Sequence, residues 1–376
     1  MQSVGELVEL LSAFEPFGMP VISLYLNAQP DERGRDNFHT FVKNELRERA
    51  KTFQANSPER ESFEKDMERI NSYLEGEVRP SANGIAIFAC SAAGDFFEAI
   101  QLDAPIENNR LYVYDQPHLY PLARLMDQYP RYAVLVANTN SARVFVFGRG
   151  AKLGSEEVKN VKTNRTKVGG WSQMRYQRHL ANYHLHHAKE VIEVLERVVE
   201  EDRAEHVIMA GDDVIIPLLR EQMPKPLADK VIDVLRLDIN TPEHEIFETT
   251  MESLREHDAQ TDAEKVKKLL DDYRGNGLAV VGVAESLTAL LNGQADDLLI
   301  NATPGEIKYD EKKVKQVLAA YSAGDEGEAV DASEPRLVAD ELVKRAQASS
   351  ATVTFIEDAS LLADVGGVGA TLRYRT

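Results

Sequence analysis

The amino-terminal part of the chain alternates short apolar runs with charged segments in which apolar residues recur every three to four positions. Apolar runs bounded by turn residues predict strands at 20–26, 84–89, 96–102 and 110–114. The helical spacing predicts helices at 5–11, 36–53 and 58–74, and Asn56-Ser57-Pro58 is typical of a helix start. Helices beside strands predict an α/β sandwich for this part.

The middle of the chain shows the same alternation with a longer helix. Runs at 132–136 and 143–147 predict two strands joined by a turn at Asn138-Thr139-Asn140. A helix is predicted from about Met174 to Glu200, because apolar residues follow one stripe: Leu180, Tyr183, His187, Val191, Val194, Leu195 and Val198. Polar residues follow another stripe: Arg175, Arg178, Asn182, His186 and Lys189. Residues 206–211 predict a buried parallel strand, and helical sequence continues to about Tyr273.

The carboxyl-terminal part begins after the turn sequence 274–277. Strands are predicted at 278–283, 297–300, 352–356 and 368–374, with helices at 284–291 and 359–364. The acidic, small-residue stretch 323–335 is typical of a mobile linker or loop. The pattern therefore predicts three α/β domains, at 1–128, 129–274 and 275–376.

Composition narrows the class of protein. With 43% hydrophobic and 28% charged residues over 376 positions, the chain is typical of soluble globular proteins. No run approaches the ~18 apolar residues of a membrane span, and the start lacks the pattern of a signal peptide, so we expect a cytoplasmic protein without a membrane contact. The single cysteine, Cys90, excludes an internal disulfide and a CxxC metal site.

One segment departs from the acidic character of the chain. The net charge is −19, but residues 158–178, here called the basic segment, carry six basic residues and no acidic one: Lys159, Lys162, Arg165, Lys167, Arg175 and Arg178. A positive segment on a negative body is attracted to a polyanion. The alternative interpretation is a solvated loop.

Other candidate sites are weaker. His179, His184, His186 and His187 show no His-Glu-x-x-His spacing, so no metal site or cofactor is expected. The glycine-rich sequence 365–370 precedes a strand and not a helix, so it predicts a tight turn in place of a nucleotide loop. The Asp212-Asp213 pair after a predicted parallel strand predicts a helix cap, with a cation site as the alternative.

The centre of the basic segment has the chemistry of an RNA-contacting tip. Gly169 and Gly170 let the backbone approach a bulky ligand, and Trp171 offers a stacking face for a base, with Tyr176 as a second. Gln173 carries an amide donor and acceptor that can orient water or a ribose hydroxyl. Basic side chains and the amino terminus of the long helix both favour phosphate.

These residues resemble the central domain of the archaeal and eukaryotic class-1 release factor and Pelota superfamily. Release factors carry Gly-Gly-Gln, then serine and an arginine–aromatic pair that enters a long helix; the matching residues here are Gly169, Gly170, Ser172, Arg175, Tyr176 and Arg178. Trp171 stands at the position of the catalytic glutamine. Gln173 follows two residues later, which is similar to the Vms-type relatives that act on peptidyl-tRNA.

The resemblance extends to both flanks. Strands at 20–26, 83–87 and 109–114 look like the first release-factor domain, but its Asn-Ile-Lys-Ser and Tyr-x-Cys stop-codon motifs are absent from the sequence. Residues 277–300 and 366–375 resemble the third domain, which contacts a translational GTPase in this superfamily. The resemblance therefore implies a ribosome-directed factor, with elongation factor Tu as the analogous bacterial partner.

Three functions stay open on this resemblance. The first is a hibernation factor of the Balon type, whose Gly169–Gln173 motif occupies the peptidyl-transferase centre from the A site; Trp171 favours it, because a bulky ring suits stacking and blocking. The second is a peptidyl-tRNA hydrolase in which Gln173 positions water or the ribose hydroxyl. The third is a nuclease that cleaves transfer RNA ends away from the ribosome.

Overall fold

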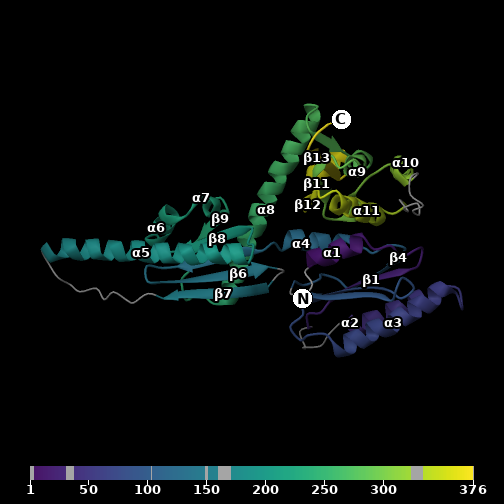
Figure 1. The fold of residues 1–376 in the computed structure, drawn as a ribbon, viewed down its shortest axis with the longest axis horizontal. Coiled ribbons are helices and arrows are strands. Elements are labelled where there is room, and N and C mark those ends of the chain that lie inside the picture. The colour runs from purple at the N-terminus through teal and green to yellow at the C-terminus, as the bar shows by residue number, and fades with distance from the viewer. Residues whose placement is uncertain are drawn as a thin grey trace. The chain divides into compact units, whose positions relative to one another are not determined.

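A computed structural model describes residues 4–30, 38–102, 104–148, 151–159, 171–322 and 333–375. It contains three sheets with helices packed on them, which confirms the predicted α/β class (Figure 1). The chain forms two compact units, one of residues 1–128 and 261–376 and the other of residues 129–260. Each sheet lies inside one of the three predicted domain ranges, whose boundaries stay a prediction.

The first unit contains an antiparallel sheet from the amino-terminal part of the chain, in the order β3-β2-β1-β4. Its strands are β1 Val21–Asn27, β2 Gly84–Cys90, β3 Phe96–Leu102 and β4 Arg110–Tyr114. One face packs against α2 Phe38–Ala50 and α3 Pro58–Gly76. The predicted cap of α3 is confirmed, since the Ser57 hydroxyl accepts a hydrogen bond from the Arg60 amide at 3.2 Å.

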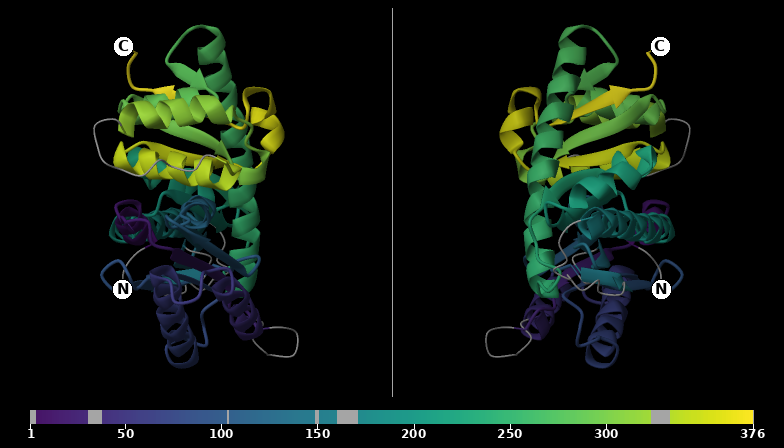
Figure 2. Two further views of the ribbon diagram at one scale, coloured as in Figure 1. Left: turned by 90° about the vertical axis from the view of Figure 1, so that its right-hand side faces the viewer. Right: turned by 90° about the vertical axis from the view of Figure 1, so that its left-hand side faces the viewer.

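The same unit contains a sheet from the carboxyl-terminal part, in the order β10-β13-β11-β12. Its strands are β10 Ala279–Val281, β11 Ala295–Asn301, β12 Thr352–Ile356 and β13 Val368–Leu372, and only β11 and β12 are parallel among its pairs. Figure 2 shows α9 Val283–Leu291 and α11 Pro335–Ala348 on one face and the last turns of α8 Glu243–Arg274 on the other; α10 Glu311–Ser322 and the short helix η1 Pro304–Glu306 complete this part.

The predicted tight turn before the last strand is confirmed. Gly366 and Gly367 follow the short helix η2 Ala359–Val365 with φ of 80° and 81°, a left-handed conformation that side chains disfavour. A Cβ on Gly366 would lie 2.7 Å from the Lys308 carbonyl oxygen. The predicted linker at 323–335 lies mostly outside the described residues, and α11 begins at Pro335.

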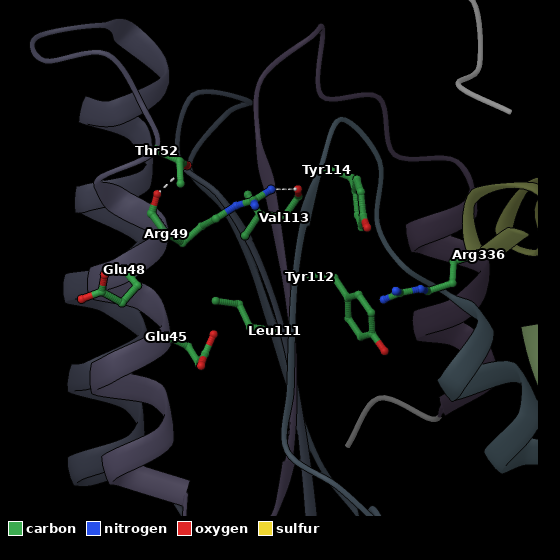
Figure 3. A pocket seen from close by; sticks show the side chains of 9 residues that line it. All are labelled: Glu45, Glu48, Arg49, Thr52, Leu111, Tyr112, Val113, Tyr114 and Arg336. Atoms are coloured by element: carbon green, nitrogen blue, oxygen red, sulfur yellow. Dashed lines mark hydrogen bonds between the residues drawn. The ribbon is translucent and has the colours of Figure 1, made fainter. Parts of the chain in front are cut away.

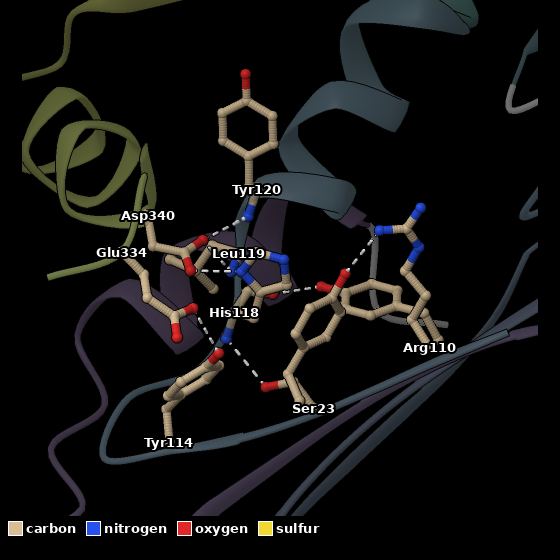
Figure 4. A network of polar contacts seen from close by, with 10 residues as sticks. Ser23, Arg110, Tyr114, His118, Leu119, Tyr120, Glu334 and Asp340 are labelled. Atoms are coloured by element: carbon tan, nitrogen blue, oxygen red, sulfur yellow. Dashed lines mark hydrogen bonds and ion pairs between the residues drawn. The ribbon is translucent and has the colours of Figure 1, made fainter. Parts of the chain in front are cut away.

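A buried carboxylate links the amino-terminal and carboxyl-terminal parts of the chain within the first unit (Figure 4). Asp340 of α11 accepts hydrogen bonds at 2.9 Å from the backbone amides of Leu119 and Tyr120, at the start of α4 Tyr120–Gln128. Its second oxygen contacts the His118 ring, and the His118 amide donates to Ser23 of β1 at 2.9 Å. Asp340 therefore caps α4, which packs beside the amino-terminal helix α1 Val4–Ser12.

The second unit is built on the mixed sheet β7-β6-β5-β8-β9. Its strands are β5 Tyr132–Ala137, β6 Ser141–Gly148, β7 Ala151–Lys159, β8 His206–Gly211 and β9 Val231–Leu235. Helices α5 Trp171–Glu201, α6 Ile215–Gln222 and α7 Lys225–Ala228 bury one face, and the first part of α8 buries the other. Alternate residues of β5 therefore belong to two different cores, which explains its unbroken apolar run.

Three features of this unit differ from the sequence interpretation. Residues 151–159 form β7, so Lys159 closes a strand and does not lie in a loop. Residues 231–235 form the edge strand β9, where continuous helix was expected. The long helix begins at Trp171 instead of Met174. Strand pairing extended regular structure into β7 and β9, and the helical hydrogen bonds of α5 continue one turn further towards the amino terminus than its side-chain pattern indicated.

Candidate nucleic-acid interface

The polarity of the sheet in the second unit fixes where the basic segment leaves it. Strands β5, β8 and β9 are parallel, and β7 has the same direction because β6 runs antiparallel to both β5 and β7. The carboxyl ends of these four strands therefore share one edge of the sheet. Lys159 is the last residue of β7 at this edge, and residues 160–170 lie outside the described part of the chain.

Helix α5 runs back over the sheet from beyond the same edge. Its 31 residues span about 46 Å at 1.5 Å per residue. Close packing begins at His187 and continues through Val191 and Leu195, whereas Asn182 and His186 are exposed. Figure 1 shows the amino-terminal part of α5 extending past the ends of the strands. The helix thus carries its own start away from the sheet.

His187 attaches α5 to the edge of the sheet. Its Nε2 lies 3.2 Å from the carbonyl oxygen of Asn138, the residue that follows β5. The Asn138 side chain in turn accepts hydrogen bonds from the amides of Asn140 and Ser141, both at 2.9 Å, and so holds the β5–β6 turn. Burial lowers the pKa of His187, because the charged imidazolium loses hydration.

An ion pair fixes β7, the strand that leads into the basic segment, to the same helix. The guanidinium of Arg197 binds both carboxylate oxygens of Glu156, at 3.1 and 2.7 Å. Both side chains are partly exposed, so the pair contributes only about 0–1 kcal/mol to stability. The pair links β7 to α5, the two elements that flank residues 160–170.

The structure places some predicted site residues and leaves others outside its described part. Trp171, Ser172 and Gln173 lie in the first turn of α5, and Arg175, Tyr176 and Arg178 follow in the next turns; their side chains lie outside the described residues, as does that of Lys159. Gly169, Gly170, Lys162, Arg165 and Lys167 fall in the segment 160–170, outside the described residues. The helix start at Trp171 places the peptide dipoles of α5 behind the motif, where they favour an anion.

The same edge carries a pocket that the sequence interpretation missed. It has a volume of about 310 Å³ and is lined by residues from the ends of β8 and β9 and from α6: Gly211, Asp213, Ile216, Pro217, Arg220, Val234, Leu235 and Arg236. Nearby, Asp212 accepts hydrogen bonds from the amides of Val214 and Ile215 at 3.0 and 2.9 Å, which confirms its predicted capping role. The only sequence signal for the pocket was its place after a parallel strand.

A second pocket, of about 300 Å³, lies in the first unit between α2 and the edge strand β4 (Figure 3). Glu45 and Glu48 balance the charges of Arg49 and Arg336 on its walls. Arg49 already donates to the Val113 carbonyl oxygen at 2.8 Å, and the Arg336 guanidinium lies 5.7 Å from the centre of the Tyr112 ring. This pocket therefore lacks the positive charge that a polyanion requires.

Two further classes of site receive no support from the described part of the chain. Within 4–30, 38–102, 104–148, 151–159, 171–322 and 333–375, no three or more His, Cys, Asp or Glu side chains gather as metal ligands. None of the helices described over these ranges is long and apolar enough to cross a membrane.

Comparison with known proteins gives relatives for this arrangement. The curated proteins MT2704 and Rv2629, both named as uncharacterized proteins of Mycobacterium tuberculosis (strains CDC 1551 and H37Rv), are 27% identical over 273 residues, which is 69% of this chain and 70% of each relative. Similar solved structures include a ribosome-bound archaeal Pelota with ABCE1 (15% identity, TM-score 0.40, 100% and 95% of the two chains) and S. cerevisiae Dom34 (10%, 0.43, 78% and 79%).

An archaeal translation termination factor, aRF1, is 16% identical with a TM-score of 0.26 and covers 99% of this chain and 97% of its own. The family description that matches is bacterial archaeo-eukaryotic release factor family 10, over residues 117–255. That range contains the five-stranded sheet, the basic segment and α5. Over these residues the chain is similar to that family of bacterial release-factor-like proteins, which is the resemblance that its Gly-Gly motif indicated.

Proposed function

We propose that the protein is a ribosome-binding translation factor that enters the A site and places its Gly169–Gln173 motif at the peptidyl-transferase centre. The observation that carries this proposal is the family match over residues 117–255, which includes the motif. The fold supports it, since α5 begins at Trp171 and extends past the sheet. A motif at the start of a projecting helix can enter a narrow RNA site that the acidic body cannot.

Occupancy of an idle ribosome, as in a hibernation factor, is the version that the motif favours. Trp171 holds the position where a release factor has its glutamine, and an indole ring stacks on a base with about 1–3 kcal/mol. The missing stop-codon motifs remove the usual signal for peptide release. The C-terminal sheet, by its resemblance to the third release-factor domain, would contact a translational GTPase such as elongation factor Tu.

Hydrolysis of peptidyl-tRNA is the second candidate, and the position of Gln173 favours it. Gln173 lies in the first turn of α5, where a side-chain amide can hold a water or ribose hydroxyl without titrating. Preorganised placement of this kind lowers a barrier without an acid or base. A nuclease acting away from the ribosome, the third candidate, would instead cleave naked transfer RNA.

Sedimentation with empty ribosomes tests occupancy. Trp171→Ala is expected to weaken binding by about 1–3 kcal/mol because stacking is lost. Lys162→Glu with Arg165→Glu is expected to weaken it more, while Lys267→Glu with Lys268→Glu, the same charge change on an exposed part of α8, leaves binding intact. If six phosphates are neutralised, the slope of log affinity against log salt is roughly −4. Unchanged binding in both motif variants, or a flat salt response, contradicts the proposal.

Peptide release from purified ribosomal complexes separates the two ribosomal versions. Occupancy predicts that the wild type and Gln173→Ala release peptide at the same background rate while both bind ribosomes. Hydrolysis predicts release by the wild type and a loss of about 100-fold or more in Gln173→Ala, which is the usual effect of removing a positioning group. Cleavage of free transfer RNA by the wild type would contradict both.

A further inference from the structure

The pocket at the carboxyl ends of β8 and β9 has a composition suited to one unit of a single RNA strand. Four apolar residues line it, Ile216 and Pro217 of α6 with Val234 and Leu235 of β9. Two arginines, Arg220 and Arg236, also line it. A ribose or base packs on an apolar surface, and a phosphate binds to arginine through charge-assisted hydrogen bonds.

The two arginines remain available to a ligand. Within the described ranges of the chain, the Arg220 guanidinium has no hydrogen-bond or ion-pair partner. Arg236 has one, an Asp213 carboxylate at 3.6 Å, and these side chains are 88% and 89% exposed. A pair so exposed is worth about 0–1 kcal/mol, so an incoming phosphate can displace it.

The close approach of two strands at the pocket requires a glycine. Gly211 ends β8 at the pocket wall, and a Cβ there would lie 2.4 Å from the carbonyl oxygen of Ala137 in the neighbouring strand. Any side chain would therefore separate β5 from β8 at this edge. The glycine keeps the strand ends, and hence Asp213 and the α6 start, in register.

The position of the pocket links it to the basic segment. The pocket opens at the carboxyl ends of β8 and β9, and Lys159 ends β7 at the same edge because these strands are parallel. A strand of RNA that reaches the basic segment can continue along this edge. The rest of a chain with net charge −19 repels such a strand, so two exposed arginines at one edge provide a local attraction.

We propose that this pocket binds one phosphodiester group of single-stranded RNA through Arg220 and Arg236, with the adjoining nucleoside on Ile216, Pro217, Val234 and Leu235. The proposal rests on the proposed function, since it supplies a second RNA contact beside the Gly169–Gln173 motif. The carboxylate of Asp213 competes with the phosphate for Arg236, so the occupied and empty states differ in the partner of that guanidinium.

The test measures affinity for two probes, empty ribosomes by sedimentation and a 12-nucleotide single-stranded RNA by fluorescence anisotropy. The variants are Arg220→Ala with Arg236→Ala, and Arg255→Ala with Lys268→Ala as a control that removes two exposed charges of α8. The pocket variant is expected to bind both probes about tenfold more weakly, with the salt slope reduced by about 0.7 for the one lost phosphate. The control is expected to bind both like the wild type.

Asp213→Asn provides a variant of opposite sign. Removing the competing carboxylate frees Arg236, so affinity for both probes is expected to rise about two- to fivefold, an outcome that a folding defect cannot produce. Wild-type affinity and salt slope in the pocket variant overturn the proposal. Weaker ribosome binding with unchanged oligonucleotide binding assigns the pocket to a ribosomal protein and also overturns it.

A failure of the proposed function can be distinguished from a failure of the pocket proposal. If the wild type does not sediment with ribosomes, the oligonucleotide alone decides the pocket: a tenfold loss in the double variant supports it, and no loss overturns it.

Discussion

Single residues set the chemistry at the edge of the five-stranded sheet. Trp171 and Gln173 lie in one turn of α5. The residue that would stack on a base and the residue that would position a water are therefore only a few ångströms apart along the helix. His187, farther along the helix, is 1% exposed and bonds the Asn138 carbonyl. It couples the geometry of the helix to pH, because its neutral form is the one that the buried site favours.

The stability of the protein is expected to fall on acidification through His187. Its pKa is lowered in the folded state, so below the unfolded value of about 6.5 the unfolded chain binds a proton that the folded chain does not. The His187 contribution is complete above that pH and is lost, at up to about 1.4 kcal/mol per pH unit, as the pH falls towards the folded pKa.

Denaturant unfolding of the wild type and of His187→Gln, measured from pH 7.5 to pH 5, isolates this contribution. The glutamine keeps a donor for the Asn138 carbonyl but does not titrate, so the difference in unfolding free energy between the two proteins should shrink as the pH falls. A difference that is constant with pH would show that His187 does not carry the dependence.

At the scale of elements, α5 consists of a half that packs on the sheet, from His187 onward, and a half that projects beyond it. The packed half buries Ala188, Val191, Leu195 and Val198 against the sheet. The projecting half has no such stripe among its described side chains from 182 to 186. A long helix that is stabilised at one end by packing can extend its other end through intrahelical hydrogen bonds alone. Such an end can reach into a binding site, but a residue that breaks one of these hydrogen bonds changes its direction.

A proline at Asn182 should separate reach from stability. Proline removes an intrahelical hydrogen bond and clashes with the preceding turn, at a cost of about 3 kcal/mol in a helix interior. In the projecting half the helix can kink or fray locally without disturbing the packed core. The unfolding free energy should therefore change by less than about 1 kcal/mol, while ribosome affinity falls at least tenfold.

Sedimentation and denaturant unfolding of Asn182→Pro, with Asn182→Ala as the control that keeps the helix straight, measure both effects. Lys189→Pro, in the packed half, should instead lower stability by about 3 kcal/mol. Wild-type ribosome binding by Asn182→Pro would mean that the direction of α5 does not matter.

At the scale of the whole molecule, residues from opposite ends of the sequence form one compact unit. Asp340 is the central contact, since its carboxylate receives the Leu119 and Tyr120 amides and the His118 ring. Arg124 adds a bidentate pair with Glu357, at 3.2 and 2.9 Å, on the exposed side of α4. The buried contact dominates, because solvent screens the exposed pair.

Asp340→Ala should therefore destabilise the first unit by about 3–5 kcal/mol, since it leaves buried amide donors without an acceptor. Glu357→Ala, which removes the exposed pair, should cost less than about 1 kcal/mol. Thermal or denaturant unfolding of the two variants gives the comparison. Equal losses would show that the buried carboxylate is not what joins the ends of the chain.

The hydrophobic periodicity of the sequence predicted the buried helices and strands better than the edge strands. Strongly patterned segments were predicted within a few residues: β1 to β4, β5, β6, β8, β12 and the packed half of α5. These runs bury their side chains, and burial imposes the period on the sequence. The edge strands β7 and β9 were missed, because their pairing with β6 and β8 is a contact between distant segments that the local sequence pattern does not record.

The sequence by itself determined the resemblance to release factors, the basic segment and the chemistry of its motif, because these depend on residue types at adjacent positions. Only the tertiary structure decided which edge of the sheet the segment leaves, where α5 begins and how Asp340 joins the chain ends. It alone brought Arg220 and Arg236 to one pocket. These are contacts between residues distant in sequence, and their geometry follows from strand direction and packing, which no local pattern records.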